Sequence, residues 1–281
     1  MIEPFASDAE LLADIGATAG LTDGHVRLWW LGQSGFLVQW RGRHLLLDPY
    51  LSDSLTEKYA ATAKPHVRMT RRAVDPARLD FIDVVTSSHA HTDHLDAGTL
   101  GPLMRSNPAV ALVIAEANRA VTIERLGIEP TMPIGLAVGD AVDIAGFHIE
   151  AVPAAHETLD PRFVGFVVRC GDWTLYHSGD TLLYEGMADR LRPFRIDVAL
   201  LPINGRSPER QVAGNLSASE AADLGKGIGA RIVIPCHYDM FTFNTADPRE
   251  FVDACHRIGQ NCHVSRCGER WDTSALPAPR W

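Results

Sequence analysis

The segment that most constrains this chain is the run H-A-H-T-D-H at residues 89–94, with three histidines and an aspartate in six positions. It follows Phe81–Thr86 closely, a short apolar run typical of a strand buried on both faces. Alternate side chains of an extended or turning backbone point the same way, so His89 and His91 can bind one metal ion while Asp93 and His94 turn towards a neighbouring ion. Imidazole with carboxylate suits Zn, Mn or Fe(II) and does not suit Ca. The run therefore predicts a metal site at the end of a buried strand.

Three more candidate ligands lie where apolar runs end elsewhere in the chain. His156 and His237 each end such a run, and Asp180 lies just past another, in a glycine-containing turn that frees its carboxylate to bridge two ions. Taken singly, each of these residues has an ordinary reading as a core or surface side chain. Taken together, they occupy the same kind of position as residues 89–94. This is what a site built from loops at one edge of a sandwich requires.

The order of apolar runs and helix signals predicts an α/β fold. A β meander over residues 26–50 precedes buried strands and a helix. A second meander over residues 141–180 is likewise followed by buried strands and helices. A capping box at Ser217–Glu220 and the Asp247-Pro248 pair each predict the start of a helix. The simplest packing is a four-layer αββα sandwich, with two sheets face to face and helices outside.

No composition shift marks a linker, so we expect residues 1–281 to form a single domain. Residues 1–25 form an N-terminal extension with a short helix from Asp8, which covers an edge of the fold or packs on a partner. Residues 52–78 are polar and predict a long loop or irregular helix that serves as a lid. Three arginines of that segment, Arg68, Arg71 and Arg72, either close over an anionic substrate or form a solvated face.

Composition narrows the classes of partner. The 281 residues are 46% hydrophobic and 22% charged, which is ordinary for a globular protein, and the net charge of −9 disfavours binding to nucleic acids or anionic membranes. We found neither a membrane-spanning apolar run nor the pattern of a signal peptide in the sequence. The five cysteines are odd in number and include no C-x-x-C pair, so we expect reduced thiols in a cytoplasmic protein.

The ordered set of the 89–94 run, His156, the S-G-D turn at Asp180 and His237 resembles the metallo-β-lactamase superfamily. That resemblance implies an αββα sandwich with a dinuclear metal centre at its edge. It assigns the first ion to His89, His91 and His156, and the second to Asp93, His94 and His237, with Asp180 bridging. In the oxygen-reducing diiron branch a glutamate takes the position of His91, so the resemblance favours hydrolysis over redox chemistry.

Four further stretches are similar to the UlaG-like lactonases, which include the L-ascorbate-6-phosphate lactonase and are usually described as manganese-dependent. The stretches are W-L-G-Q-S-G-F-L-V-Q at 30–39, D-P-Y-L-S at 48–52, L-P-I-N-G-R at 201–206 and C-H-Y-D-M-F-T-F-N-T-A-D-P at 236–248. The similarity runs from about residue 26 to residue 267. It implies two divalent ions, Mn or Zn with Fe also compatible.

Two such ions roughly 3.5–4 Å apart can hold a water between them and lower its pKa towards neutrality, which makes it a nucleophile. Asp93 is the predicted catalytic residue, because it can orient that nucleophile or accept its proton. Predicted substrate contacts are Arg206, Asn204 and Tyr238, and Asp239 is predicted to orient a metal-bound imidazole. For Arg206, an ion pair with an acid on the surface is an equally good reading.

These expectations describe a hydrolase that opens a small anionic lactone or a sugar-phosphate-like ester. A small-nucleotide phosphodiesterase using the same centre is an alternative, and a non-catalytic metal-binding scaffold is a third. The complete ligand set argues against the scaffold. The predicted partner is a small anionic substrate, with no nucleic acid and no membrane, and the resemblance suggests self-association.

Overall fold

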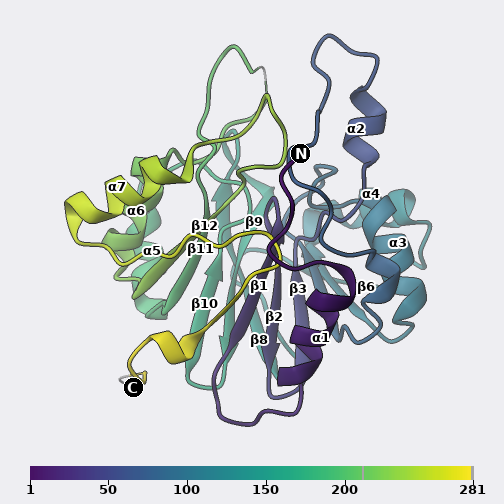
Figure 1. Ribbon diagram of the computed structural model, residues 1–281, viewed down its shortest axis with the longest axis horizontal. Coiled ribbons are helices and arrows are strands. Elements are labelled where there is room, and N and C mark those ends of the chain that lie inside the picture. The colour runs from purple at the N-terminus through teal and green to yellow at the C-terminus, as the bar shows by residue number, and fades with distance from the viewer. Residues whose placement is uncertain (211, 280–281) are drawn as a thin grey trace.

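The computed structural model describes residues 1–210 and 212–279 and shows two β-sheets packed face to face, with helices on their outer faces (Figure 1). The predicted four-layer αββα sandwich is therefore confirmed. Most of the buried apolar side chains belong to one cluster that takes members from both sheets. Short polar turns separate the strands, which are rich in Val, Ile, Leu and Trp. These residue types fit a pleated surface that is buried on one or both faces.

The first sheet has seven strands in the order β13-β1-β2-β3-β4-β5-β6. Strands β1 to β3 form the predicted antiparallel meander, and β3 to β6 run parallel. The strands are β1 Arg27–Gly32, β2 Gly35–Trp40, β3 Arg43–Leu47, β4 Val84–Ser87, β5 Ala111–Ala115, β6 Pro133–Leu136 and β13 Arg270–Asp272. The parallel strands all end at the same edge, so the loop after β4 opens there.

The second sheet has six strands in the order β12-β11-β10-β9-β8-β7. Strands β7 to β10 are antiparallel neighbours, and β10, β11 and β12 are parallel, so β8, β10 and β12 run in one direction. The strands are β7 Ala141–Ile144, β8 Phe147–Ala155, β9 Leu159–Cys170, β10 Trp173–His177, β11 Val198–Pro202 and β12 Ile232–Cys236. The loops after β8, β10 and β12 therefore share one edge of this sheet.

The helices cover the outer faces, with α3 and α4 beside the first sheet and α6 and α7 beside the second (Figure 1). The α-helices are α1 Asp8–Thr18, α2 Ser54–Tyr59, α3 Ala97–Ser106, α4 Arg119–Leu126, α5 Met187–Leu191, α6 Ala218–Ile228 and α7 Pro248–Ile258. Short 3-10 turns are η1 Pro76–Arg78, η2 Glu116–Asn118, η3 Arg192–Phe194 and η4 Thr273–Ala275. The predicted capping box is present, because Ser217 and Glu220 each accept from the other's backbone N–H.

The N-terminal segment packs on the first sheet. Leu11 and Ile15 of α1 are buried in the main core, and the Trp29 indole donates to Asp14. Of the two expected placements for residues 1–25, the structure therefore shows this segment covering the chain's own sheet. All five cysteines are free thiols, as predicted. Across residues 1–210 and 212–279, the helices are all too short or too polar to cross a membrane.

Several elements differ from the sequence prediction. Residues 52–78 contain a regular helix, α2, which projects beyond the body of the sandwich (Figure 1). Strand β4 begins at Val84, because the preceding backbone N–H of Ile82 bonds the Asn107 side chain instead of a neighbouring strand. The sequence pattern does not indicate helix α3, which contains Pro102, or strand β13, which is three residues long.

Candidate metal centre

The predicted ligands come together at one edge of the sandwich. The 89–94 loop follows β4 of the first sheet, whereas His156, Asp180 and His237 follow β8, β10 and β12 of the second. Their donor atoms form two groups in which all atoms lie within 4.8 Å of one another. The first group is His89, His91 and His156, and the second is Asp93, His94, Asp180 and His237. The division coincides with the two ligand sets that the resemblance implied.

Asp180 lies between the two groups. Its Oδ2 is 3.7 Å from Nε2 of His156 in the first group and 3.4 Å from Nε2 of His237 in the second. Its Oδ1 is 3.3 Å from Nε2 of His94. Gly179 makes this placement possible, since it has φ +59° and a Cβ there would lie 2.7 Å from the Ser88 hydroxyl. A single carboxylate thus reaches both groups, as a bridging ligand must.

The donor atoms are those that a cation would satisfy. Nε2 of His89, Nε2 of His94 and Oδ1 of Asp180 are buried and have no hydrogen-bond partner. Leaving such atoms unpaired in the interior is unfavourable, so a native fold retains them where a function needs them. Mixed imidazole and carboxylate donors match borderline divalent ions. The residues therefore fit the metal centre that the fold family implies.

Neighbouring groups contact three of the imidazoles, those of His89, His94 and His156, at their other nitrogen. Nδ1 of His94 donates to Oδ2 of Asp48 at 2.7 Å, and Nδ1 of His156 donates to the Gly214 carbonyl at 3.0 Å. Nδ1 of His89 lies 3.1 Å from the Ser88 hydroxyl, whose own proton goes to Asp48. With the proton at Nδ1, the Nε2 lone pair of a neutral imidazole is free for a metal. These contacts therefore orient the rings for ligation.

Sequence reasoning missed Asp48 and Gln33. Nε2 of Gln33 donates to Oδ2 of Asp93 at 2.7 Å and lies 3.0 Å from Nε2 of His237. Gln33, Asp48 and His237 all have positive φ, an uncommon conformation outside glycine that clusters at functional sites. Both missed residues lie in stretches quoted above for their similarity, W-L-G-Q-S-G-F and D-P-Y-L-S, which was the signal available in the sequence.

Charges at the centre stabilise one another in the metal-free protein. Burial disfavours protonation of His237, but Asp180 and Asp93 outweigh that effect and raise its pKa to about 9. The pKa of His94 is likewise raised against the effect of burial, chiefly by Asp180 and Asp93. Burial raises the pKa of Asp180, but the two histidines outweigh it and hold the carboxyl well below its usual range. Cation binding at these imidazoles must therefore displace protons.

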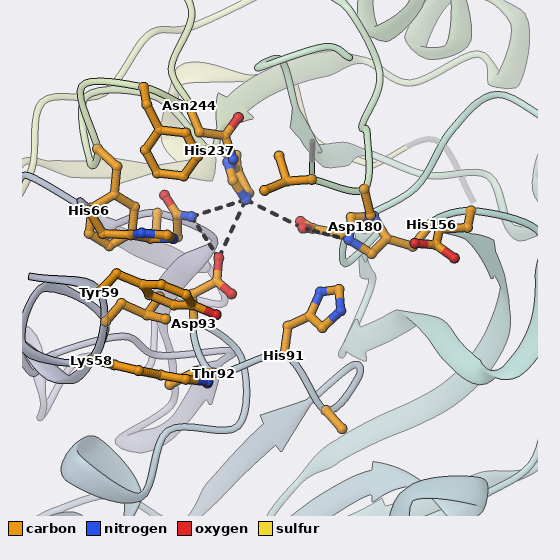
Figure 2. Close-up of a pocket in the computed structure, with 18 of the residues that line it drawn as sticks. Lys58, Tyr59, His66, His91, Thr92, Asp93, His156, Asp180, His237 and Asn244 are labelled. Atoms are coloured by element: carbon orange, nitrogen blue, oxygen red, sulfur yellow. Dashed lines mark hydrogen bonds and ion pairs between the residues drawn. The ribbon is translucent and has the colours of Figure 1, made fainter. Parts of the chain in front are cut away.

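A cavity of about 340 Å³ opens directly above the two groups. His91, Asp93, His156, Asp180 and His237 form one part of its lining (Figure 2). The segment around α2 supplies another part of the lining with Lys58, Tyr59 and His66, and the loop after β12 adds Phe241, Phe243 and Asn244. The expectation that residues 52–78 lie over the site is supported by these contacts.

The predicted substrate residues lie outside this lining. For Arg206 the structure shows the alternative, an ion pair with an acid, because its guanidinium donates to both carboxylate oxygens of Glu220 at 2.7 and 2.8 Å. Asn204 is buried and bonds Asn244 and Asn215, so it supports a lining residue without reaching the cavity.

Tyr238 is also turned away from the cavity. Its ring stacks on Trp30 at 4.3 Å and its hydroxyl donates to the Ser265 carbonyl at 2.5 Å. Asp239 contacts Thr70 and Thr245 through its backbone, whereas the carboxylate that holds a ligand imidazole is Asp48. Substrate contact by Tyr238 and imidazole orientation by Asp239 are therefore corrected.

The three arginines considered above for contact with a substrate, Arg68, Arg71 and Arg72, are committed to other partners. Arg68 pairs with Asp53, Arg71 with Glu3 and Asp8, and Arg72 with Asp75. The cation that this segment brings to the cavity is Lys58.

The fold and the cluster match a known class of protein. The profile of the β-lactamase superfamily domain matches residues 43–238, which is more than half of the chain. The chain therefore belongs to the metallo-β-lactamase superfamily. It is 31% identical over 239 residues to a UPF0173 metal-dependent hydrolase of Caldivirga maquilingensis, covering 84% of this chain and 92% of that relative. The narrower group to which such relatives belong is the UPF0173 metal-dependent hydrolases.

Other relatives agree with this placement. A UPF0173 metal-dependent hydrolase of Opitutus terrae is 31% identical over 255 residues, which cover 87% of this chain and 98% of the relative. Among solved structures, Igni18, a metallo hydrolase of the archaeon Ignicoccus hospitalis, superposes with a TM-score of 0.66 at 26% identity, covering 88% of this chain and 98% of its own.

Proposed function

We propose that this chain opens a small anionic lactone or cleaves a sugar-phosphate-like ester, as its resemblance to the UlaG-like lactonases suggests. One observation carries the proposal. Seven side chains of ligand type converge beneath a cavity of about 340 Å³, near the lower end of the range for small-molecule sites. A polymeric substrate would need a longer groove, whereas a small molecule with one or two rings fits a cavity of this volume.

The residues present account for the steps of such a hydrolysis. Divalent ions held by these side chains, Mn or Zn with Fe also compatible, would lower the pKa of a water and polarise the oxygen of the scissile group. Water adds to the acyl carbon and the C–O bond to the leaving oxygen breaks. One proton of the water ends on that oxygen, which becomes an alcohol, and the other is released as the carboxylic acid ionises; in a lactone both groups stay on one molecule. Asp93 faces the cavity and is held by Gln33, so its carboxylate can orient the attacking water or take its proton.

Charge at the cavity favours an anionic substrate. Two divalent ions would exceed the charge of the two ligand carboxylates, Asp93 and Asp180, so the loaded centre is positive. Lys58 and Arg125 add positive charge at the cavity wall, against the single further acid Glu157. An anion is therefore drawn to the place where the reaction occurs.

The test combines metal analysis with a substrate panel. The protein is loaded with Mn or Zn, its metal content is measured, and lactones, carboxylic esters and phosphodiesters are offered at equal concentration. We expect the wild type to hydrolyse anionic lactones or esters fastest and His91→Ala to lose bound metal and activity together. The matched control is His148→Ala, since His148 is a surface residue paired with Asp143 away from the centre.

Two outcomes contradict the proposal. Faster cleavage of phosphodiesters than of lactones and esters would assign the site to phosphodiester substrates. Full metal occupancy with no cleavage across the panel would favour a metal-binding scaffold.

A further inference from the structure

One side of the cavity is formed by four rings, which we call the ring wall: Tyr59, His66, Phe241 and Phe243. His66 is at its centre. Its ring stacks on Tyr59 at 4.2 Å with an interplanar angle of 18°, and it meets Phe243 edge-on at 4.4 Å and Phe241 at 5.2 Å. Figure 2 shows Tyr59 and His66 on the side of the cavity opposite His156 and Asp180.

The ring wall is held in place before any ligand arrives. Phe241 belongs to a small buried cluster, separate from the main core, against which Tyr59 and Phe243 also pack. The other buried members of that cluster are Tyr50, Leu55 and Met240. The hydroxyl of Thr56 donates to the His66 carbonyl at 2.8 Å, which ties the loop after α2 back to the helix. A wall with its own apolar support loses little freedom when a ligand contacts it.

Lys58 provides the complementary charge beside the ring wall. Its ammonium lies 5.2 Å from the centre of the Tyr59 ring, and no carboxylate lies within ion-pair distance of it among residues 1–210 and 212–279. Arg125, the other cation of the cavity, already donates to the carbonyls of Ala90 and Leu95 at 2.5 and 3.1 Å. Lys58 therefore offers an incoming anion an ammonium for which no carboxylate of the described residues competes, whereas part of the Arg125 guanidinium is already bound.

We propose that the ring wall and Lys58 select substrates that join a flat unsaturated ring to a carboxylate, with the ester or lactone bond reaching the metal centre. This rests on the proposed function and narrows it, because it favours such compounds over a sugar-phosphate-like ester. Phe241 is buried and supports the other rings, whereas the ring carbons of Tyr59 and Phe243 offer dispersion and edge-to-face contacts to a flat ring. They leave the hydroxyls of a sugar with few hydrogen-bond partners. A carboxylate beside that ring meets the Lys58 ammonium.

The test uses two esters that differ only in ring shape: 4-(acetoxymethyl)benzoate and trans-4-(acetoxymethyl)cyclohexanecarboxylate. Both carry one carboxylate and release a primary alcohol, so their intrinsic reactivities are similar. With metal-loaded protein we expect kcat/KM to be about 10-fold higher for the flat ring, mostly through KM, as two aromatic contacts would give. A third ester, 4-methylbenzyl acetate, lacks the carboxylate and should be poorer still.

Single variants separate the two parts of the recognition site. Tyr59→Leu and Phe243→Leu should each reduce the preference for the flat ring by about 3-fold, at unchanged metal content. Lys58→Gln should reduce the preference for 4-(acetoxymethyl)benzoate over 4-methylbenzyl acetate and leave the ring preference intact. The matched control is Lys226→Gln, since Lys226 donates to the Gly259 carbonyl at the far end of α6.

Binding of the product-like alcohol 4-(hydroxymethyl)benzoate, measured by calorimetry, tests the same idea without turnover. It should bind about 10-fold more tightly than its cyclohexane counterpart, and Tyr59→Leu should remove most of that difference. If none of the esters is cleaved but this binding preference is present, the proposed function fails, while recognition of a flat ring with a carboxylate by the ring wall and Lys58 stands. Equal affinities for the two alcohols, or a preference that Tyr59→Leu and Phe243→Leu leave unchanged, would overturn the inference.

Discussion

Replacing Asp48 by asparagine should weaken metal binding by moving a proton from one nitrogen of His94 to the other. Asp48 is fully buried and its Oδ2 accepts from Nδ1 of His94 at 2.7 Å. Its oxygens also accept from the backbone and hydroxyl of Ser88 and from the Thr86 hydroxyl at 2.8 Å. An asparagine has one acceptor oxygen, so if that oxygen keeps Thr86, its NH₂ group faces His94.

Two donors cannot face each other in the interior, so His94 would shift its proton to Nε2, the atom that must bind the metal. Loss of such an outer partner typically weakens metal binding roughly 10- to 100-fold. The lost charge-assisted hydrogen bonds should also reduce the free energy of unfolding of the metal-free protein by about 1.5–3 kcal/mol. Competition with a chromogenic chelator measures the first effect, and thermal or urea unfolding after chelator treatment measures the second.

The matched control is Asp197→Asn. Asp197 is equally buried and accepts from Arg231 and from the Thr174 backbone, at the end of the strands remote from the metal centre. It should lose stability at unchanged metal affinity. If Asp48→Asn behaves in the same way, with wild-type affinity and reduced stability, the argument from the proton on His94 is wrong.

Three further predictions concern the centre and the core. Gln33→Met keeps the side-chain size but removes the donor that holds the catalytic carboxylate, so kcat should fall roughly 10-fold at unchanged metal content, measured by steady-state kinetics and metal analysis. In the metal-free protein the pKa of His237 is raised to about 9 from an ordinary 6.5, so metal uptake below about pH 9 releases a proton. The apparent metal affinity should therefore rise with pH and level off above about pH 9. Calorimetry in buffers of different ionisation enthalpy measures the released proton, and no release at pH 7 would refute this prediction. Gly225→Ala places a Cβ 2.2 Å from Val233 and should lower the free energy of unfolding by about 1–2 kcal/mol. Gly227→Ala lies on the exposed face of the same helix and should raise the free energy of unfolding by about 0.5–1 kcal/mol. Equal unfolding midpoints in urea for the two variants would contradict this prediction.

The predicted ligands could be found from the sequence because each one follows a recognisable strand. His156, Asp180 and His237 all come after short apolar runs, and parallel strands end at a common edge. The sandwich architecture follows from the same runs, since strands buried on two faces need layers on both sides. These are local patterns whose consequence for the fold is general.

The supporting and lining residues could not be found in this way, because their roles depend on distant partners. Nothing near Asp48 in the sequence indicates that it meets His94, 46 residues away. The ring wall forms only because His66 meets Phe243 across more than half of the chain. Arg206 follows a strand at the correct edge, yet its guanidinium pairs with Glu220, the capping residue of α6, and lies outside the cavity lining.

The ligand loops come from both sheets: residues 89–94 leave the first, and His156, Asp180 and His237 leave the second. A cation bound by ligands from both sets of loops would cross-link the two sheets of the sandwich at that edge. Anything that binds only the folded chain stabilises it in proportion to the logarithm of its concentration. The supply of metal in the cell would then govern how long the protein survives unfolding and proteolysis, in addition to whether it is active.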